Sequence, residues 1–429
     1  MGQGAKRIHV WHGYLLGGTG SNIYAREMTR AWARAGHDVT LFSQDPAPER
    51  FDLGGAVTVR PDTGPLLPVF VLDRYAGRDV RRLQDCTRGE LDAWVAANAR
   101  ALRAHGRADL VLVNHVLLGG AVGAATGDPY VVKAHGSELE YSMRGNAELS
   151  AWGAEVLGAA DATIAGSGHI RRVIDEVCGP VPRVVEIPPG VDVEGWRPQA
   201  RATALARLVA EARRDPPNRD NADDRLPDEG NADRLAAFLA GERPTVVFVG
   251  KLIENKGVHV LLEAMRGLDA RLVVVGFGPL RPQLEAQAAG LEVLFTGALE
   301  HRHLVHLLAL ADASVVPSVF PEAFGMVAAE AAAAGCPPVV AEHSGLAEIA
   351  GGLRAEYPGA LADLAAFPNG DAGALHDRLA RLLALDPAQR AAVRDAARRA
   401  AVARWSWTGV AERVLALADD RRLSARSRP

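Results

Sequence analysis

The sequence has few cysteines, no surplus of charge of either sign and no long apolar run. The three cysteines among 429 residues, Cys86, Cys178 and Cys336, are far apart and have no spacing typical of a zinc site. They therefore indicate neither a disulfide framework nor a metal centre, and we expect a reducing, cytoplasmic environment. The 48 Lys and Arg residues against 52 Asp and Glu residues give a formal charge of −4. No global basic surface for nucleic acid is indicated.

No apolar segment approaches the roughly 18 residues that a membrane-spanning helix requires, and residues 1–7 lack the pattern of a signal peptide. The tail 421–428 is basic and could contact an anionic surface, so membrane contact is possible but not favoured. A composition of 48% hydrophobic and 23% charged residues is typical of a folded globular chain. The length predicts two or three domains and leaves the oligomeric state unknown.

The first half of the sequence alternates strand and helix patterns. A strand at 7–12 leads through Gly17-Gly18-Thr19-Gly20 into a helical stretch that ends at Gly36, and a second strand follows at 39–42. This order predicts a βαβ unit with parallel strands. The later strands expected in the same sheet are 110–113, 130–132, 162–164 and 184–187.

The second half repeats this alternation, with strand patterns at 245–249, 272–275, 293–295, 313–316 and 338–340. We therefore predict the α/β class, with two Rossmann-like domains whose parallel sheets face each other across a cleft. The polar stretch 212–233 has almost no large apolar side chains, and we expect it to be an exposed insertion. The predicted domains are an N-terminal domain at 1–188, a C-terminal domain at 189–404, and a helix with a basic tail at 405–429.

Two segments that follow predicted strands suggest phosphate binding. The glycines of Gly17-Gly18-Thr19-Gly20 would allow backbone N–H groups to approach an anion closely. Lys251 and Lys256 follow the strand that opens the second half, where two ammonium groups could neutralise a diphosphate. Each segment also has an ordinary interpretation, since the first could be a simple turn and the lysines could be solvated. Gly276-Phe277-Gly278 follows another strand and can equally be a turn.

The segment from Glu322 to Glu330 combines a strand end, a glycine and the start of a helix. Free N–H groups near Gly325, Met326 and Val327 could hold a phosphate at the positive end of that helix. Glu322 and Glu330 would then be available to accept hydrogen bonds from sugar hydroxyls. Without further information, a capped helix with Glu330 on its solvated face explains the pattern equally well.

Taken together, these segments resemble the glycosyltransferases of family 4, retaining enzymes with the two-domain GT-B architecture. The resemblance covers nearly the whole chain and rests on Gly17-Gly18, Gly36 to Val39, His135-Gly136, Ile187 to Asp192, Gly250 to Gly257 and the Glu-x7-Glu element Glu322 to Glu330. The chain departs from the family at Lys251, where arginine is more frequent, and at Ser344-Gly345, where two glycines are frequent. The insertion has no family counterpart.

The resemblance implies a role for each candidate residue. Lys251 and Lys256 would bind the donor diphosphate, Glu322 the transferred sugar, and Glu330 the nucleotide ribose. From the first domain, Gly18 would contact the phosphate and His135 would face the reacting sugar, so that His135, Lys256 and Glu322 form the catalytic set. The other implied donor-binding positions are Gly250, Gly278, Phe324, Gly325, Met326 and Val327. The final helix would cross back to the N-terminal domain.

The implied reaction moves a sugar from a nucleotide-sugar, most often a UDP-sugar, to a hydroxyl of a small-molecule or glycan acceptor. No carboxylate nucleophile is apparent and no Asp-x-Asp follows a predicted strand, so the leaving diphosphate would assist acceptor deprotonation and no metal or cofactor is expected. The two domains would close over the donor. A GT-B sugar-nucleotide epimerase and a non-catalytic nucleotide-sugar binding protein are the alternatives. An NAD dehydrogenase fits poorly, because the first loop lacks Gly-x-Gly-x-x-Gly.

Overall fold

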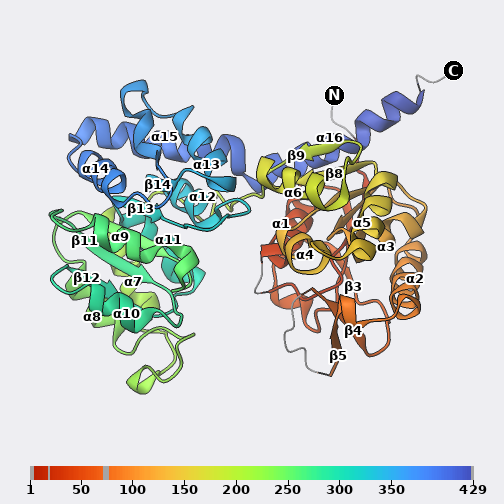
Figure 1. Ribbon diagram of the computed structural model, residues 1–429, viewed down its shortest axis with the longest axis horizontal. Helices are drawn as coiled ribbons and strands as arrows, with labels where there is room; N and C mark the ends of the chain where they lie inside the picture. The colour runs from red at the N-terminus through yellow and green to blue at the C-terminus, as the bar shows by residue number, and fades with distance from the viewer. Residues whose placement is uncertain (1–3, 18–19, 71–76, 427–429) are drawn as a thin grey trace. The chain divides into compact units, whose positions relative to one another are not determined.

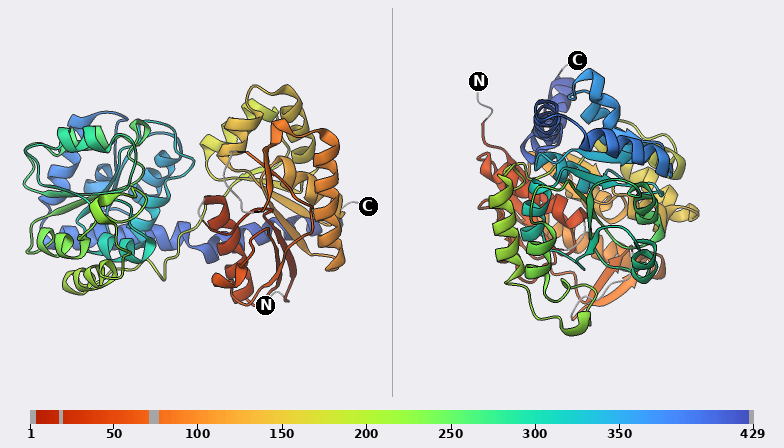
Figure 2. Two further views of the ribbon diagram at one scale, coloured as in Figure 1. Left: turned by 90° about the horizontal axis from the view of Figure 1, so that it is seen from below. Right: turned by 90° about the vertical axis from the view of Figure 1, so that its left-hand side faces the viewer.

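The computed structural model describes residues 4–17, 20–70 and 77–426 and divides into two compact units (Figure 1). The first unit comprises residues 1–190 and 407–429, and the second comprises residues 191–406. Each unit contains one large parallel sheet with helices on both of its faces (Figure 2). The predicted α/β class with two Rossmann-like halves is confirmed.

The sheet of the first unit has seven strands in the order β3-β2-β1-β6-β7-β8-β9, and all neighbouring strands are parallel. Its strands are β1 Arg7–Trp11, β2 Asp38–Phe42, β3 Val57–Val59, β6 Leu110–Asn114, β7 Tyr130–Lys133, β8 Ala162–Ala165 and β9 Val184–Glu186. The predicted strands are therefore confirmed as one sheet. The pattern did not reveal β3, a short strand whose Val57 is exposed at the sheet edge. A separate two-stranded sheet pairs β4 Leu66–Val69 with β5 Asp79–Arg82.

Two apolar clusters hold the helices against the two faces of this sheet. Alternate residues of a strand point to opposite faces, so Ile8 and Val10 of β1 belong to one cluster and Trp11 to the other. The helices of this unit are α1 Gly20–Arg34, α2 Arg88–Ala104, α3 Leu117–Thr126, α4 Gly136–Glu138, α5 Ala147–Ala159, α6 Gly168–Cys178 and α16 Trp407–Arg426.

The sheet of the second unit has six parallel strands in the order β12-β11-β10-β13-β14-β15. They are β10 Thr245–Val249, β11 Arg271–Val275, β12 Val293–Phe295, β13 Ala313–Val316, β14 Pro338–Ala341 and β15 Ala366–Phe367. The helices are α7 Arg201–Ala212, α8 Asn231–Phe238, α9 Val258–Ala264, α10 Arg281–Gln287, α11 His301–Leu310, α12 Met326–Ala333, α13 Ser344–Arg354, α14 Ala372–Leu383 and α15 Pro387–Trp405. One continuous apolar cluster joins these helices to the sheet.

Both strand orders reverse direction at a central strand. The chain runs outward from β1 to β2 and β3 and then returns to β6 on the other side, and β10 has β11 and β13 as its neighbours in the same way. Ligands of open parallel sheets bind where the strand order reverses, at the carboxyl ends of the strands. The loops after β1, β6, β10 and β13 are therefore the places to look for a site.

The polar stretch 212–233 differs in part from the expected exposed insertion. Residues 219–225 are exposed, but Asn218, Asp228 and Asn231 are buried. The Asp228 carboxylate accepts hydrogen bonds from Arg281 Nη1 at 2.8 Å and Nη2 at 2.6 Å, and its backbone N–H donates to the Thr296 carbonyl at 2.8 Å. The segment is anchored by polar contacts, which a count of apolar side chains does not reveal.

The C-terminal helix begins two residues later than predicted. Helix α15 ends at Trp405, Ser406 is extended with φ −68° and ψ 138°, and α16 starts at Trp407 in the first unit. Trp32 Nε1 of α1 donates to the Ala411 carbonyl of α16 at 3.0 Å. Within the described residues, no helix has the length and apolar character that a membrane span needs.

Candidate active site

Lys251 and Lys256 lie in the loop after β10, and this loop packs against the loop after β13. Gly257 has φ 67°, and a Cβ atom there would lie 1.9 Å from the Pro317 carbonyl oxygen. The Asn255 carbonyl accepts the backbone N–H of Val319 at 3.0 Å. These contacts bring two segments more than sixty residues apart into one structure at the carboxyl edge.

The Lys256 ammonium group forms an ion pair with the Glu322 carboxylate. The same carboxylate oxygen accepts the Ser318 hydroxyl at 2.6 Å. The side chains of Lys256 and Glu322 are 31% and 21% exposed, so a ligand can reach both. Lys251 is exposed, and no described residue pairs with its ammonium group. The loop therefore presents one paired and one unpaired cation.

Glu322 is held by three residues that the sequence analysis did not assign. Its backbone N–H donates to Ser344 Oγ at 2.9 Å, and Ser344 Oγ donates to His343 Nδ1 at 3.1 Å. His343 Nε2 donates to the Ser318 carbonyl at 2.6 Å. Ser344 has φ 47°, in the left-handed region that favours glycine. Ser344, which stands where the family often has a glycine, thus supplies a hydroxyl that accepts a hydrogen bond from the Glu322 backbone. This departure from the family pattern was the only sign of its role in the sequence.

The first turn of α12 lies directly after Glu322. Gly325 precedes it with φ 109°, and Phe324 is buried. The N–H groups of Met326 and Val327 belong to the first turn of a helix, where no intrahelical acceptor is available. They lie at the positive end of the helix dipole, and anion binding there stays a prediction.

Glu330 lies in the second turn of α12 and is half-buried. Burial raises the pKa of its carboxyl to about 8. No described group donates a hydrogen bond to this carboxyl, so its acceptor oxygens remain available for hydroxyl groups of a ligand.

Gly250 and Gly278 belong to neighbouring loops that contact each other closely. The Gly250 N–H donates to the Val275 carbonyl at 3.0 Å, and a Cβ atom at Gly278 would lie 2.5 Å from the Leu252 carbonyl oxygen. Close backbone packing explains these glycines without a ligand, and their role in donor binding stays a prediction.

His135 lies in the first unit, between β7 and α4, beside two other histidines. Its Nε2 lies 3.1 Å from Asn114 Oδ1, and its ring centroid lies 4.9 Å from that of His115. Burial lowers the pKa of His12 to about 4, although hydrogen bonds with Asn22 and the Leu15 carbonyl act in the opposite direction. Burial also lowers the pKa values of His115 and His135 well below the usual value. This edge of the first sheet is therefore built from neutral imidazoles.

Glu138 adds a buried carboxyl to this group. It accepts the Val116 N–H at 2.6 Å, and its Oε1 lies 3.8 Å from His115 Nδ1. Burial raises the pKa of Glu138 to about 8. Neither Glu138 nor His115 belongs to a contiguous sequence motif that would have predicted its place in this group. Gly18, the other candidate of the first unit, lies outside the described residues.

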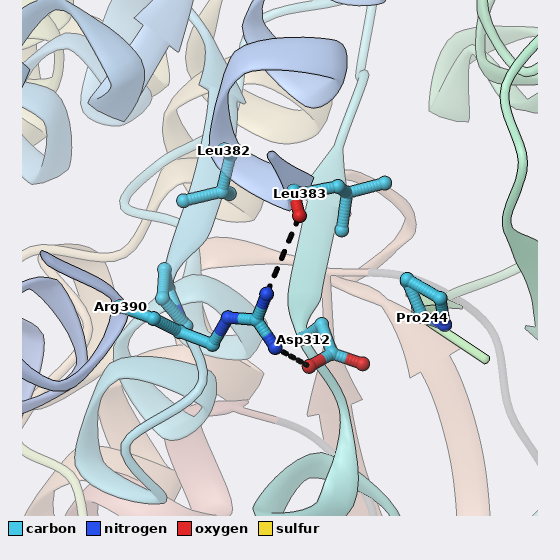
Figure 3. A pocket seen from close by; sticks show the side chains of 6 residues that line it. Pro244, Asp312, Leu382, Leu383 and Arg390 are labelled. Atoms are coloured by element: carbon cyan, nitrogen blue, oxygen red, sulfur yellow. Dashed lines mark hydrogen bonds and ion pairs between the residues drawn. The ribbon is translucent and has the colours of Figure 1, made fainter. Parts of the chain in front are cut away.

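A separate pocket lies at the opposite, amino edge of the second sheet (Figure 3). Residues that precede β10, β13 and β14, including Pro244 and Asp312, line it together with Arg390. Arg390 bonds to the Leu383 carbonyl at 3.4 Å and lies 4.0 Å from Asp312. The pocket encloses about 10 Å³, the space of about one water molecule. It is too small for a nucleotide. No described group of three or more His, Cys, Asp or Glu residues is arranged to hold a metal ion.

Comparisons with known proteins agree with these two units. Residues 18–194 match the family Glycosyltransferase Family 4, and residues 232–400 match Glycosyl transferases group 1. The D-inositol 3-phosphate glycosyltransferase of Xylanimonas cellulosilytica is 29% identical over 92% of this chain and 90% of its own length. The phosphatidyl-myo-inositol mannosyltransferase of Mycobacterium leprae is 34% identical over 44% of this chain and 51% of its own length.

Solved structures share the fold over almost the whole chain. Sucrose-phosphate synthase from Thermosynechococcus elongatus has a TM-score of 0.66 at 23% identity and covers 98% of this chain and 100% of its own. Anabaena HepE in complex with UDP-glucose has a TM-score of 0.64 at 16% identity, with coverage of 98% and 100%. At these identities the likeness concerns the architecture alone. The structural likeness shows the GT-B architecture. The two family matches together span most of the chain, and they show that it is a glycosyltransferase with a Family 4 domain followed by a group 1 domain.

Proposed function

We propose that this glycosyltransferase transfers a sugar from a nucleoside diphosphate sugar to an acceptor hydroxyl with retention of anomeric configuration and without a metal ion. The observation that supports this most is the grouping of Lys256, Glu322 and the first turn of α12 at one sheet edge, with the unpartnered Glu330 one turn further on. Cations and N–H groups suit a diphosphate, and carboxylates suit hydroxyls.

The chemistry follows from where negative charge develops. As the bond between the sugar and the diphosphate breaks, the electron pair stays with the diphosphate, and Lys251, Lys256 and the α12 N–H groups stabilise it. The departing diphosphate accepts the proton of the attacking hydroxyl on the same face of the sugar. Glu322 orients the sugar and Glu330 the ribose, and His135 of the first unit acts on the sugar.

Names of relatives guide the choice of substrates. A UDP-sugar remains the first donor candidate, and GDP-mannose is the second, because a Mycobacterium tuberculosis relative that is 43% identical over 110 residues is named as GDP-mannose-dependent. The Xylanimonas relative, similar over most of the chain, is named for D-inositol 3-phosphate. We propose a phosphorylated cyclitol as the first acceptor to test. A cytoplasmic location stays a prediction.

The test measures release of nucleoside diphosphate from UDP- and GDP-sugars with and without D-inositol 3-phosphate, in the presence of a chelator. The proposal expects acceptor-dependent release and a product whose anomeric configuration matches that of the donor. Conversion of the donor sugar without an acceptor would instead identify an epimerase. Binding of the donor without any turnover across an acceptor panel would identify a binding protein.

A further inference from the structure

Four hydrogen bonds connect the carbonyl of Gly17 to His135 through three buried side chains. Asn22 Nδ2 of α1 bonds to the Gly17 carbonyl, and Asn22 Oδ1 lies 2.8 Å from His12 Nε2. Asn114 Nδ2, at the end of β6, lies 3.4 Å from His12 Nδ1. Asn114 Oδ1 lies 3.1 Å from His135 Nε2. The connected residues come from separate elements of the first unit.

The backbone carbonyl at one end determines the direction of every bond. Heavy-atom positions alone do not say which ring nitrogen carries the proton, but the chemistry of the partners does. A carbonyl oxygen only accepts, so the NH₂ group of Asn22 must face Gly17 and its oxygen must face His12. Because the Asn22 oxygen only accepts, His12 donates through Nε2. The neutral ring has no second N–H, so the Leu15 carbonyl must share this proton and Nδ1 is an acceptor.

The same argument continues to His135. Because His12 Nδ1 accepts, Asn114 presents its NH₂ group to His12 and its oxygen to His135. His135 Nε2 must then donate, and the neutral ring keeps Nδ1 unprotonated. Reversing either amide would place acceptor against acceptor. Such a mismatch is costly here, because His12 and Asn114 are fully buried and Asn22 is 7% exposed.

We propose that Asn22, His12 and Asn114 are positioning residues that hold His135 in the neutral Nε2–H tautomer with Nδ1 as a hydrogen-bond acceptor. The consequence for catalysis rests on the proposed function: His135 would accept a hydrogen bond from a substrate hydroxyl through Nδ1. Asn22 and His12 reach this ring only through Asn114, and neither is a catalytic residue.

The test is ¹⁵N NMR of the full protein labelled at histidine, at neutral pH and without ligand, with resonances assigned from single His→Gln variants. His12 and His135 are each expected to show a protonated Nε2 and an unprotonated Nδ1. A His135 proton on Nδ1, or a doubly protonated His135 ring, would overturn the proposal.

Two variants test the connection itself. Asn22→Ala removes the group that sets the direction, so His135 should show a second population protonated on Nδ1. An ionised Asn114→Asp carboxylate can still accept from His135 Nε2 but cannot donate to His12, so His135 should keep its Nε2 proton while His12 gains a proton on Nδ1. A His135 spectrum in Asn22→Ala identical to that of the unaltered protein would refute the connection, and so would an unchanged His12 in Asn114→Asp at a pH where the new carboxylate is ionised.

Asn98→Ala is the matched control. Asn98 is also a buried helical asparagine and accepts from Trp11 Nε1 at 3.0 Å, but it is outside the connected set. It should leave both tautomers unchanged. If the protein transfers sugar, Asn22→Ala should also lower kcat about tenfold with little change in the donor KM. The NMR result needs no turnover, so failure of the proposed function and failure of the tautomer assignment can be distinguished.

Discussion

The carboxyl edges of the two sheets occupy equivalent places in similar folds but are built from opposite kinds of side chain. The edge of the second sheet has a partly exposed ion pair, Lys256 with Glu322, beside free helix N–H groups. The edge of the first has His12, Asn114 and His135, all uncharged and joined by directed hydrogen bonds. The charged edge of the second sheet suits binding of a charged group. The uncharged edge of the first sheet suits orientation of a neutral group. The same fold thus carries two chemically different edges.

The largest effect is expected where the charged edge depends on close backbone contact. Gly257→Ala would place a Cβ atom 1.9 Å from the Pro317 carbonyl oxygen in a left-handed conformation. Gly267 also has positive φ, 81°, but no atom lies within 4 Å of its Cβ position. Gly267→Ala should cost about 1 kcal/mol of unfolding free energy, and Gly257→Ala more than twice as much, measured by urea denaturation. Equal losses would contradict the contact between the loops.

Lys256→Ala should lower turnover more than tenfold, about 1.4 kcal/mol of transition-state stabilisation, because negative charge on the leaving group grows in the transition state. Steady-state kinetics with whichever nucleotide-sugar supports acceptor-dependent diphosphate release measure this. Lys6→Ala is the control, because Lys6 precedes β1 in the first unit and lies at neither carboxyl edge. An unchanged turnover rate in Lys256→Ala would show that Lys256 does not stabilise the leaving group.

The two glutamates of the charged edge should differ in what they bind. Glu330→Ala should weaken affinity for the nucleoside diphosphate about tenfold, because the ribose loses its acceptor. Glu322→Ala should leave that affinity nearly intact, since it also releases Lys256 from its ion pair, but should weaken binding of the complete nucleotide-sugar. Calorimetric titration of both ligands decides, and equal losses for the diphosphate would show that the roles are not divided.

The smallest expected effect concerns stability and pH. Burial raises the pKa of Glu330 from 4.5 to about 8, so between these values the folded protein keeps a proton that the unfolded chain loses. This contribution to stability is fully present below pH 4.5 and is lost as the pH rises toward 8. Glu330→Gln should therefore flatten the decline in urea midpoint over this range. A decline equal to that of the unaltered protein would contradict the raised pKa of the Glu330 carboxyl.

The sequence predicted the charged edge better than the neutral one. Lys251, Lys256 and the Glu322 to Glu330 segment each follow a strand within a short motif, so spacing and family resemblance were enough to select them as candidates. Asn114 lies about a hundred residues after His12 in the sequence, and the parallel pairing of β1 with β6 brings the two together. Asn22 reaches His12 from helix α1. The roles of His343 and Ser344 were not predicted either, because their contacts to Ser318 and Glu322 join the loops after two neighbouring strands.

Two predictions about chain segments were inaccurate, and each error has a physical cause. The break at Ser406 interrupts a stretch whose apolar spacing is continuous, because Trp405 packs in the second unit and Trp407 in the first. Within the 212–233 segment, Asp228 is buried in an ion pair with Arg281, and hydrophobic patterns do not reveal ion pairs.

The most direct test of the division between the two edges compares affinity and turnover in His135→Ala. We expect affinity for the nucleoside diphosphate within a few-fold of the unaltered protein, because the charged edge is intact, together with loss of most acceptor-dependent transfer. Calorimetric titration gives the first quantity and diphosphate release the second. An active His135→Ala enzyme, or a variant whose diphosphate affinity falls in step with its turnover, would contradict the assignment of charge binding to one edge and orientation to the other.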